Sequence, residues 1–265
     1  MIKKAKPKIH IASCSFGKDS IATILLALEN NEPLDRVVFS EVMFDHSRNI
    51  SGENPEHIEW VYNVAIPKLQ SMGVTVDIVK SELDYIHYFK TKVRKSGKYA
   101  GMFYGFPITG KCIINDRCKI KPIREYNKKF KDFDIVFYVG IAIDEPNRLK
   151  RLEGTNKVSL LTKYGYTEKM AMAKCEEYNL VSPCYSDSNR GGCWFCPNAK
   201  IKELVCLRKT HSHLWDELVL LSKTPNLCSN KFKYNKTLQD IEKEMDAYEL
   251  KEQLQLKLFE DNGNT

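Results

Sequence analysis

The chain has 265 residues, of which 43% are hydrophobic and 28% charged, so it can bury a substantial core and is not a disordered chain. Its formal charge of +7 suits a polyanionic ligand such as a nucleotide or RNA, although many solvated surfaces reach the same balance. The longest largely apolar run, Ile21–Leu28, is too short to span a bilayer, and no secretory leader follows the basic start. We therefore expect a cytoplasmic protein with no membrane partner.

The first half of the chain alternates expected strands and helices. Strands are expected at residues 9–13, 37–42 and 74–79, and helices at 19–29 and from Pro55 to about Met72, before Gly73. Parallel strands need crossover connections, and the intervening helices supply them. The pattern predicts an α/β fold, a doubly wound parallel sheet flanked by helices.

The regular alternation weakens after residue 80 and then returns. Residues 81–115 are basic and aromatic, and a helix at 120–130 and a buried strand at 135–140 follow them. Thr167 is the expected cap of a helix that runs to Tyr178, and two helical segments are expected at 200–221 and 238–258. We expect an α/β domain at 1–180, then a cysteine-rich loop and a helical C-terminal extension at 181–265.

One turn between the first strand and the first helix consists of Ser15, Phe16, Gly17, Lys18, Asp19 and Ser20. Backbone N–H groups and the positive end of a helix dipole converge at such a turn and favour an anion. Gly17 allows a phosphate to approach closely, and Lys18 adds charge. Asp19 fits either a Mg²⁺ ligand or a helix cap. The alternative is a capped helix behind a serine-rich turn, and the spacing is not that of a Walker A loop.

Three later segments accompany this turn. They are residues 139–148 (VGIAIDEPNR), residues 164–173 (YGYTEKMAMA) and residues 190–197 (RGGCWFCP). In their order, the four segments resemble those of the PP-loop ATP pyrophosphatases, in the branch shared with phosphoadenosine phosphosulfate (PAPS) reductases. The resemblance covers roughly residues 8–200. It implies a nucleotide-binding domain at 1–180 that binds ATP and cleaves it at the α-phosphate.

The resemblance also implies roles for individual residues at the carboxyl ends of the strands. The expected nucleotide-binding residues are Ser15, Phe16, Gly17, Lys18, Asp19, Ser20, Met43, Phe44 and Gly140. Met43 and Phe44 would flank the adenine, or else they are core residues. Asp19, Asp144, Glu145 and Arg148 are the expected catalytic residues, acting with Mg²⁺; the alternative for the last three is a surface ion pair. The family often has arginine where Ala142 stands, so substrate anion binding is expected to differ.

Nine cysteines without a secretory leader indicate reduced thiols that can bind metal. The candidates are Cys112, Cys118, Cys184, Cys193 and Cys196, of which four would hold Zn²⁺ or a [4Fe–4S] cluster. Cys118 ranks ahead of Cys112 because residues 118–122 resemble a family segment with cysteine, lysine and proline. Cys112 then either replaces Cys118 or is a free, sulfur-carrying thiol, and the alternative to a metal site is a set of buried thiols. The six histidines are scattered and are expected not to be ligands.

The expected reaction is attack of a substrate oxygen on the α-phosphate of Mg²⁺-ATP, followed by displacement of the adenylate by sulfur or nitrogen. Such chemistry resembles that of tRNA thiolases and DNA phosphorothioation enzymes, so the expected partners are an adenine nucleotide, a nucleic-acid substrate or sulfur-donor protein, and a second copy of the chain. The basic, aromatic residues 88–99 fit a nucleic-acid strand or a solvated lid. Two alternatives remain: PAPS reduction, which the cysteine-free tail disfavours, and a non-catalytic nucleotide- or nucleic-acid-binding module.

Overall fold

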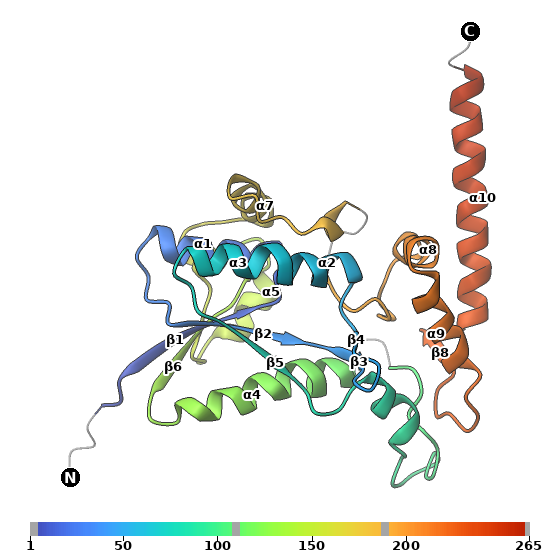
Figure 1. Cartoon of the computed structure of the whole chain (residues 1–265), viewed down its shortest axis with the longest axis horizontal. Coiled ribbons are helices and arrows are strands. Elements are labelled where there is room, and N and C mark those ends of the chain that lie inside the picture. The colour runs from blue at the N-terminus through green and yellow to red at the C-terminus, as the bar shows by residue number, and fades with distance from the viewer. Residues whose placement is uncertain (1–4, 108–111, 187–190, 263–265) are drawn as a thin grey trace.

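The computed structural model describes residues 5–107, 112–186 and 191–262 and confirms the expected α/β fold (Figure 1). Within these ranges the main sheet has five parallel strands in the order β5-β2-β1-β6-β7. The strands are β1 (Lys8–Cys14), β2 (Arg36–Glu41), β5 (Val76–Lys80), β6 (Asp134–Tyr138) and β7 (Lys157–Val158). The central strand is β1, where Ile11 pairs with Arg36 on one side and with Phe137 on the other.

The strand order reverses at β1. The chain first builds outward from β1 through β2 to β5, and it later returns to the other side of β1 with β6 and β7. Connections at such a reversal leave in opposite directions, which opens a crevice beyond the carboxyl ends of the two adjacent strands. The segments that follow β1 and β6 therefore meet at this edge of the sheet.

Helices cover both faces of the sheet (Figure 1). One face carries α1 (Lys18–Glu29), α2 (Pro55–Trp60), α3 (Ile66–Ser71), α6 (Leu160–Lys163) and α7 (Glu168–Glu177). The helix expected from Pro55 to Met72 is interrupted by a π-helical segment, η1 (Val61–Ala65). On the other face, α4 (Lys121–Asn127) packs Tyr126 against Ile9 and Val38. This two-sided cover explains why β1 and β2 are apolar along most of their length.

Several short elements were not expected from the sequence. Two antiparallel pairs, β3–β4 and β8–β9, have strands of two or three residues, which is too short for an alternating pattern to stand out. The unexpected short elements are β3 (Met43–Asp45), β4 (Ile50–Ser51), β8 (Lys231–Lys233), β9 (Lys236–Thr237), α5 (Pro146–Leu149), η2 (His87–Thr91), η3 (Asn115–Ile120), η5 (Lys150–Leu152) and η6 (Pro183–Tyr185). A further short element, η4 (Lys128–Phe130), continues α4 within the helix expected over 120–130.

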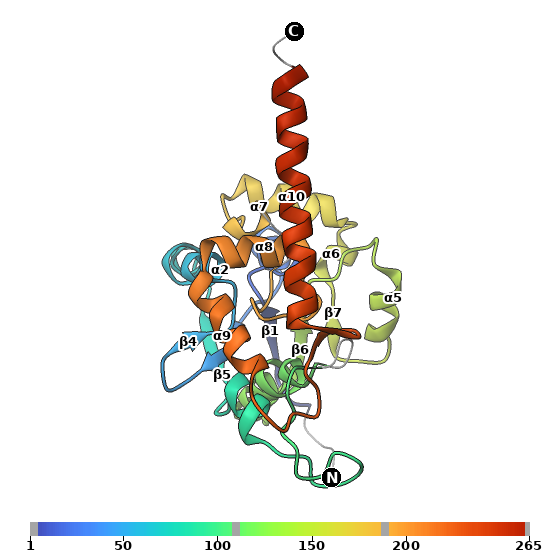
Figure 2. The same cartoon turned by 90° about the vertical axis from the view of Figure 1, so that its right-hand side faces the viewer.

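The C-terminal region consists of α8 (Ile201–Thr210), α9 (Ser212–Ser222) and α10 (Leu238–Asn262), beyond β3 and β4 (Figure 1). The single helix expected over 200–221 is wrong, because His211 leaves helical geometry with φ −133° and ψ 56° and separates α8 from α9. The far half of α10 projects away from the rest of the chain (Figure 2). Of the helices in the described ranges, none is long and apolar enough to cross a membrane.

A second hydrophobic core joins this C-terminal region to the first half of the chain. Phe44 and Tyr85 from the first half pack in it together with Trp194 and Phe195 of the cysteine loop and with Leu218 of α9. The cysteine loop is therefore held by residues from both sides of position 180. The division into domains at that position stays a prediction.

Candidate functional site

The turn after β1 is closed by its own side chains. The Ser20 hydroxyl donates to the Gly17 carbonyl at 2.9 Å and accepts from the Ser15 N–H at 3.3 Å. Phe16 takes the left-handed conformation, with φ 57°, and its buried ring packs edge-on against Phe39 of β2. The turn is thus preformed, with the first N–H groups of α1 at its mouth.

Gly17 is the N-cap residue of α1 and is extended, with φ −76° and ψ 162°. Glycine is favoured here because it has no side chain: a Cβ at this position would stand 3.1 Å from the Tyr185 hydroxyl oxygen. Asp19 is the second residue of the helix, so the alternative that Asp19 caps α1 is wrong. The carboxylate of Asp19 accepts instead from the ammonium of Lys18 at 2.8 Å.

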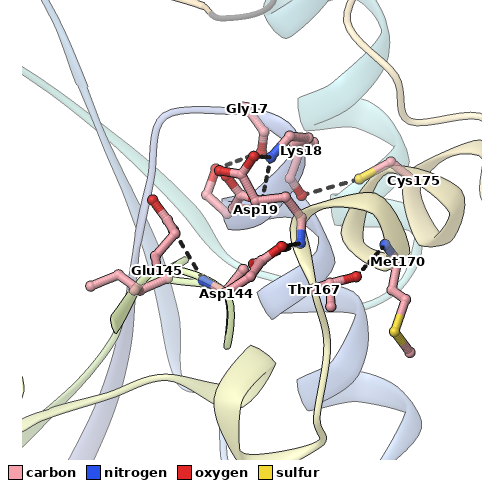
Figure 3. A network of polar contacts seen from close by, with 12 residues as sticks. Gly17, Lys18, Asp19, Asp144, Glu145, Thr167, Met170 and Cys175 are labelled. Carbon is pink, nitrogen blue, oxygen red and sulfur yellow. Dashed lines mark hydrogen bonds and ion pairs between the residues drawn. The ribbon is translucent and has the colours of Figure 1, made fainter. Parts of the chain in front are cut away.

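Three carboxylates converge beside the turn, and Figure 3 labels two of them, Asp19 and Glu145. Oxygens of Asp19, Glu145 and Glu168 lie within 4.8 Å of one another, and Lys18 pairs with Asp19 at 2.8 Å and with Glu168 at 3.6 Å. Burial raises the pKa of Asp19, although the Lys18 ammonium opposes the shift. Two cations, Lys18 and the Arg148 guanidinium that pairs with Glu145, stand against three carboxylates. The group is net negative when all three carboxylates are ionised, and this donor set is one that Mg²⁺ accepts. The ammonium of Lys18 therefore pairs with Asp19 and Glu168.

The other expected catalytic residues have structural partners at the same sheet edge. Asp144 accepts the Glu168 N–H at the start of α7, where Thr167 is the N-cap, as expected (Figure 3). Glu145 accepts the Ala142 N–H and pairs with Arg148. Asp144 therefore fixes the position of Glu168, while Arg148 reaches the cavity described next.

A cavity of about 640 Å³ lies beyond the carboxyl ends of β1, β2 and β6, large enough for a nucleotide. Its walls include Ser15, Gly17, Asp19, Ser20 and Gly140 from the expected nucleotide-binding set, and Gly191 and Gly192 from the cysteine loop. Lys119, Arg148, Arg151 and Lys157 also line it and supply positive charge. Met43 and Phe44 are buried elsewhere, and Phe44 packs against Trp194 in the second core.

Two residues that the sequence did not single out connect the turn to the cysteine loop. His57 bonds to the Ser15 carbonyl through Nε2 at 3.0 Å and to the Ser182 hydroxyl through Nδ1 at 2.7 Å. Tyr185 accepts the Lys18 N–H at 2.9 Å. His57 lies in the first turn of α2, and Tyr185 directly follows Cys184. Neither position has a local sequence signal, so only the tertiary structure shows that both residues contact the turn after β1.

The five candidate cysteines have different neighbours in the structure. Burial raises the pKa of the Tyr85 hydroxyl well above its usual range, and the nearby Cys112, Cys193 and Cys196 add to the rise. Cys112 also adds to the rise in the pKa of Cys118, which burial causes in the main. The Tyr85 hydroxyl is buried and has no hydrogen-bond partner among the described residues. Cys118 directs its thiol to the Leu83 carbonyl at 3.4 Å, and Cys184 contacts the Ser182 hydroxyl at 3.2 Å.

An ion pair between Lys119 and Glu53 lies between the cavity and two of these cysteines, Cys193 and Cys196. Lys119 lines the cavity and pairs at 2.9 Å with Glu53, whose side chain is 3% exposed. Burial alone would lower the pKa of Lys119, but Glu53 and Cys193 together raise it above its usual value. Burial likewise raises the pKa of Cys193, and Lys119 opposes that rise. A cationic group therefore stands between the nucleotide-sized cavity and the thiols.

Cysteine thiolates can bind either a single metal ion or an iron–sulfur cluster, and the two differ in the spacing of the sulfurs. Within the described ranges, no three cysteine sulfurs lie within 4.8 Å of one another, whereas Zn–S bonds of about 2.3 Å would hold them closer than that. The thiolates of an iron–sulfur cluster bind separate irons and so stand further apart. The unpartnered Tyr85 hydroxyl and the nearby Lys119 suit an anionic sulfur centre that accepts hydrogen bonds.

Comparisons with known proteins give limited matches. No protein-family model matches the chain. A stretch of 94 residues is 30% identical to the uncharacterized nin region protein ORF290 of Escherichia phage lambda, covering 35% of this chain and 31%, about a third, of that protein. The solved U34-tRNA thiolase NcsA from Methanococcus maripaludis, with its [4Fe-4S] cluster, aligns over 88% of this chain and 78% of its own, at 15% identity and a TM-score of 0.39.

Proposed function

We propose that this protein is an ATP-dependent adenylating enzyme that prepares an acceptor for sulfur transfer. The observation that carries the proposal is the shared cavity: the preformed turn after β1 forms one wall, and Gly191 and Gly192, directly before Cys193, form another. Nucleotide and thiol chemistry would thus meet in one crevice at the switch point of the sheet.

The turn and the basic side chains would bind and position the nucleotide. N–H groups at the start of α1 would hold phosphate oxygens, and Arg148, Arg151 and Lys157 would neutralise charge that develops when the α-phosphate is attacked. Asp19, with Glu145 and Glu168, would hold Mg²⁺ next to the phosphates. Catalysis would then come from positioning and from charge neutralisation.

Cys112, Cys193 and Cys196 would hold the metal centre, and a [4Fe–4S] cluster held by three protein thiolates would supply an iron site for an inorganic sulfur species. Lys119 would keep a positive charge between this centre and the nucleotide, and Glu53 would fix the position of that ammonium. Cys193 and Cys196 lie on one loop and Cys112 on a separate segment of the chain. Cys112 and Cys193 both pack against the second core, which holds the two segments together.

Release of pyrophosphate from ATP by anaerobically purified protein tests this function. The wild type is expected to form AMP and pyrophosphate in the presence of Mg²⁺ and an acceptor, and Asp19→Asn is expected to lower the rate at least about 10-fold because one Mg²⁺ ligand is lost. Asp132→Asn is the matched control, since Asp132 is exposed before β6, at the opposite edge of the sheet. Equal rates in wild type and Asp19→Asn would remove Asp19 from the mechanism.

For the acceptor we propose a nucleic acid. Residues 93–103 fold back on themselves, with the Arg94 N–H bonded to the Met102 carbonyl at 2.9 Å. Lys92 and Arg94 stack on the Tyr104 ring, at 5.4 and 4.4 Å from its centre, while Lys95, Lys98 and Tyr99 are exposed at the tip. Exposed cations beside an aromatic ring suit a single strand, whose phosphates and bases they contact separately.

The double variant Lys95→Gln/Lys98→Gln is expected to bind single-stranded RNA about 10-fold more weakly than the wild type. Its plot of log affinity against log salt is expected to be shallower by about 1.4, since each phosphate contact contributes about 0.7 for a single strand. Fluorescence anisotropy at several salt concentrations measures both values. Lys169→Gln/Lys202→Gln removes the same charge from exposed positions on α7 and α8 and serves as the control. Identical salt slopes in the two double variants would contradict the proposed contact surface.

A further inference from the structure

Tyr185 occupies the position at which an anion would meet the turn after β1. Its hydroxyl oxygen accepts the Lys18 N–H at 2.9 Å, and it would stand 3.1 Å from a Cβ at Gly17. The Lys18 N–H belongs to the first residue of α1 and has no intrahelical acceptor. The tyrosine oxygen therefore satisfies one of the N–H groups that a phosphate oxygen would otherwise satisfy.

The segment that carries Tyr185 is fixed to the same turn at a second point. Ser182, directly before η6, is 2% exposed and bonds to Nδ1 of His57, while Nε2 of His57 donates to the Ser15 carbonyl. Because a carbonyl only accepts, Nε2 carries the proton and Nδ1 accepts from the Ser182 hydroxyl. Burial lowers the pKa of His57, which keeps the ring neutral and this arrangement intact. The segment 182–185 thus reaches the turn through two side chains, that of Tyr185 directly and that of Ser182 through His57.

The Tyr185 hydroxyl is protonated and can donate a hydrogen bond. Burial raises the pKa of Tyr185 to about 12, so the phenol remains protonated at neutral pH. A phenol can donate and accept at once, and here its oxygen accepts from Lys18. Among the described residues no acceptor for its proton is found, and the ring lines the nucleotide-sized cavity.

We propose that Tyr185 is a phosphate-recognising residue of this site. A phosphate oxygen of the nucleotide takes over the Lys18 N–H, and the tyrosine hydroxyl turns from acceptor to donor toward that oxygen. This assignment rests on the proposed nucleotide site and adds a specificity element to it. The hydroxyl contacts only the phosphate, so it distinguishes nucleotides from nucleosides and leaves adenine recognition to other residues.

Calorimetric titration of Tyr185→Phe with Mg²⁺-ATP and with adenosine tests the assignment. The variant is expected to bind ATP about 10-fold more weakly, or about 1.4 kcal/mol, and adenosine with unchanged affinity. The matched control is Tyr178→Phe, because the Tyr178 hydroxyl donates to Glu29 at the C-terminal end of α1, away from the turn. A Tyr185→His variant, which retains a donor, is expected to recover part of the ATP affinity, and a thermal unfolding scan of each variant verifies its fold.

The possible outcomes distinguish a failure of the role proposed for Tyr185 from a failure of the proposed nucleotide site. Equal losses for ATP and adenosine would show a structural role and overturn the assignment. Unchanged or tighter ATP binding by Tyr185→Phe would also overturn it, the latter because the hydroxyl would then only compete for the Lys18 N–H. A wild-type protein that binds no ATP would contradict the proposed function itself, and with it this role of Tyr185.

Discussion

Replacing Gly140 by alanine is expected to weaken ATP binding by about 100-fold, or about 2.7 kcal/mol. A Cβ at Gly140 would lie 2.6 Å from the Asp19 carbonyl carbon and 2.7 Å from the Ser20 nitrogen. Both of these atoms are backbone, so they cannot turn aside as a flexible side chain would, and the turn after β1 must shift. Overpacking of this kind also costs about 1–3 kcal/mol in the free energy of unfolding. Calorimetric titration with ATP and denaturant unfolding measure the two effects.

Gly73→Ala is the control for a general loss of stability. Gly73 ends α3 with φ +84° and has no atom within 4 Å of its Cβ position, so alanine there strains the backbone by about 1–2 kcal/mol without touching the site. The control is expected to lose stability and keep its affinity for ATP. Should Gly140→Ala bind ATP as tightly as Gly73→Ala does, the contact of Gly140 with the turn would have no bearing on nucleotide binding.

Serine at Cys112, Cys193 or Cys196 is expected to remove the metal from anaerobically purified protein. The three thiols lie near one buried hydroxyl, that of Tyr85. Ligands that share one centre act as a set, so the loss of any one of them is expected to lower metal content and stability together. Iron, sulfide and zinc analysis with a visible spectrum measures the metal. Iron with matching sulfide would indicate a cluster, whereas zinc in a colourless protein would indicate a single ion.

Cys118→Ser and Cys184→Ser test whether the metal is held by Cys112, Cys193 and Cys196 or by the cysteines ranked first from the sequence. Cys118 contacts the Leu83 carbonyl and Cys184 contacts Ser182, so both variants are expected to keep their metal. Cys175→Ser, in α7, is the neutral control. Loss of metal in Cys184→Ser with retention in Cys112→Ser would restore the sequence ranking. Metal-free wild-type protein would leave the cysteines as buried thiols.

The sequence by itself determined the architecture and the position of the turn after β1. Apolar strands such as residues 9–13, which alternate with amphipathic helices, require crossover connections and hence a parallel sheet. A glycine- and serine-rich turn between a strand and a helix has one local geometry, so its role follows from neighbours in the chain. Gly140 was expected at the site because residues 139–148 resemble a motif of the PP-loop family.

Tertiary structure alone decided which distant groups meet. Cys112 and Cys118 are six residues apart, and the resemblance of residues 118–122 to a family segment favoured Cys118 as the ligand. Only the packing of the second core places Cys112 near the Tyr85 hydroxyl and the Cys118 thiol against the Leu83 carbonyl. His57, Lys119 and Tyr185 belong to three separate segments, and nothing in their local sequence states that they line one cavity. Side-chain direction and long-range contact depend on how elements pack, which chain spacing does not encode.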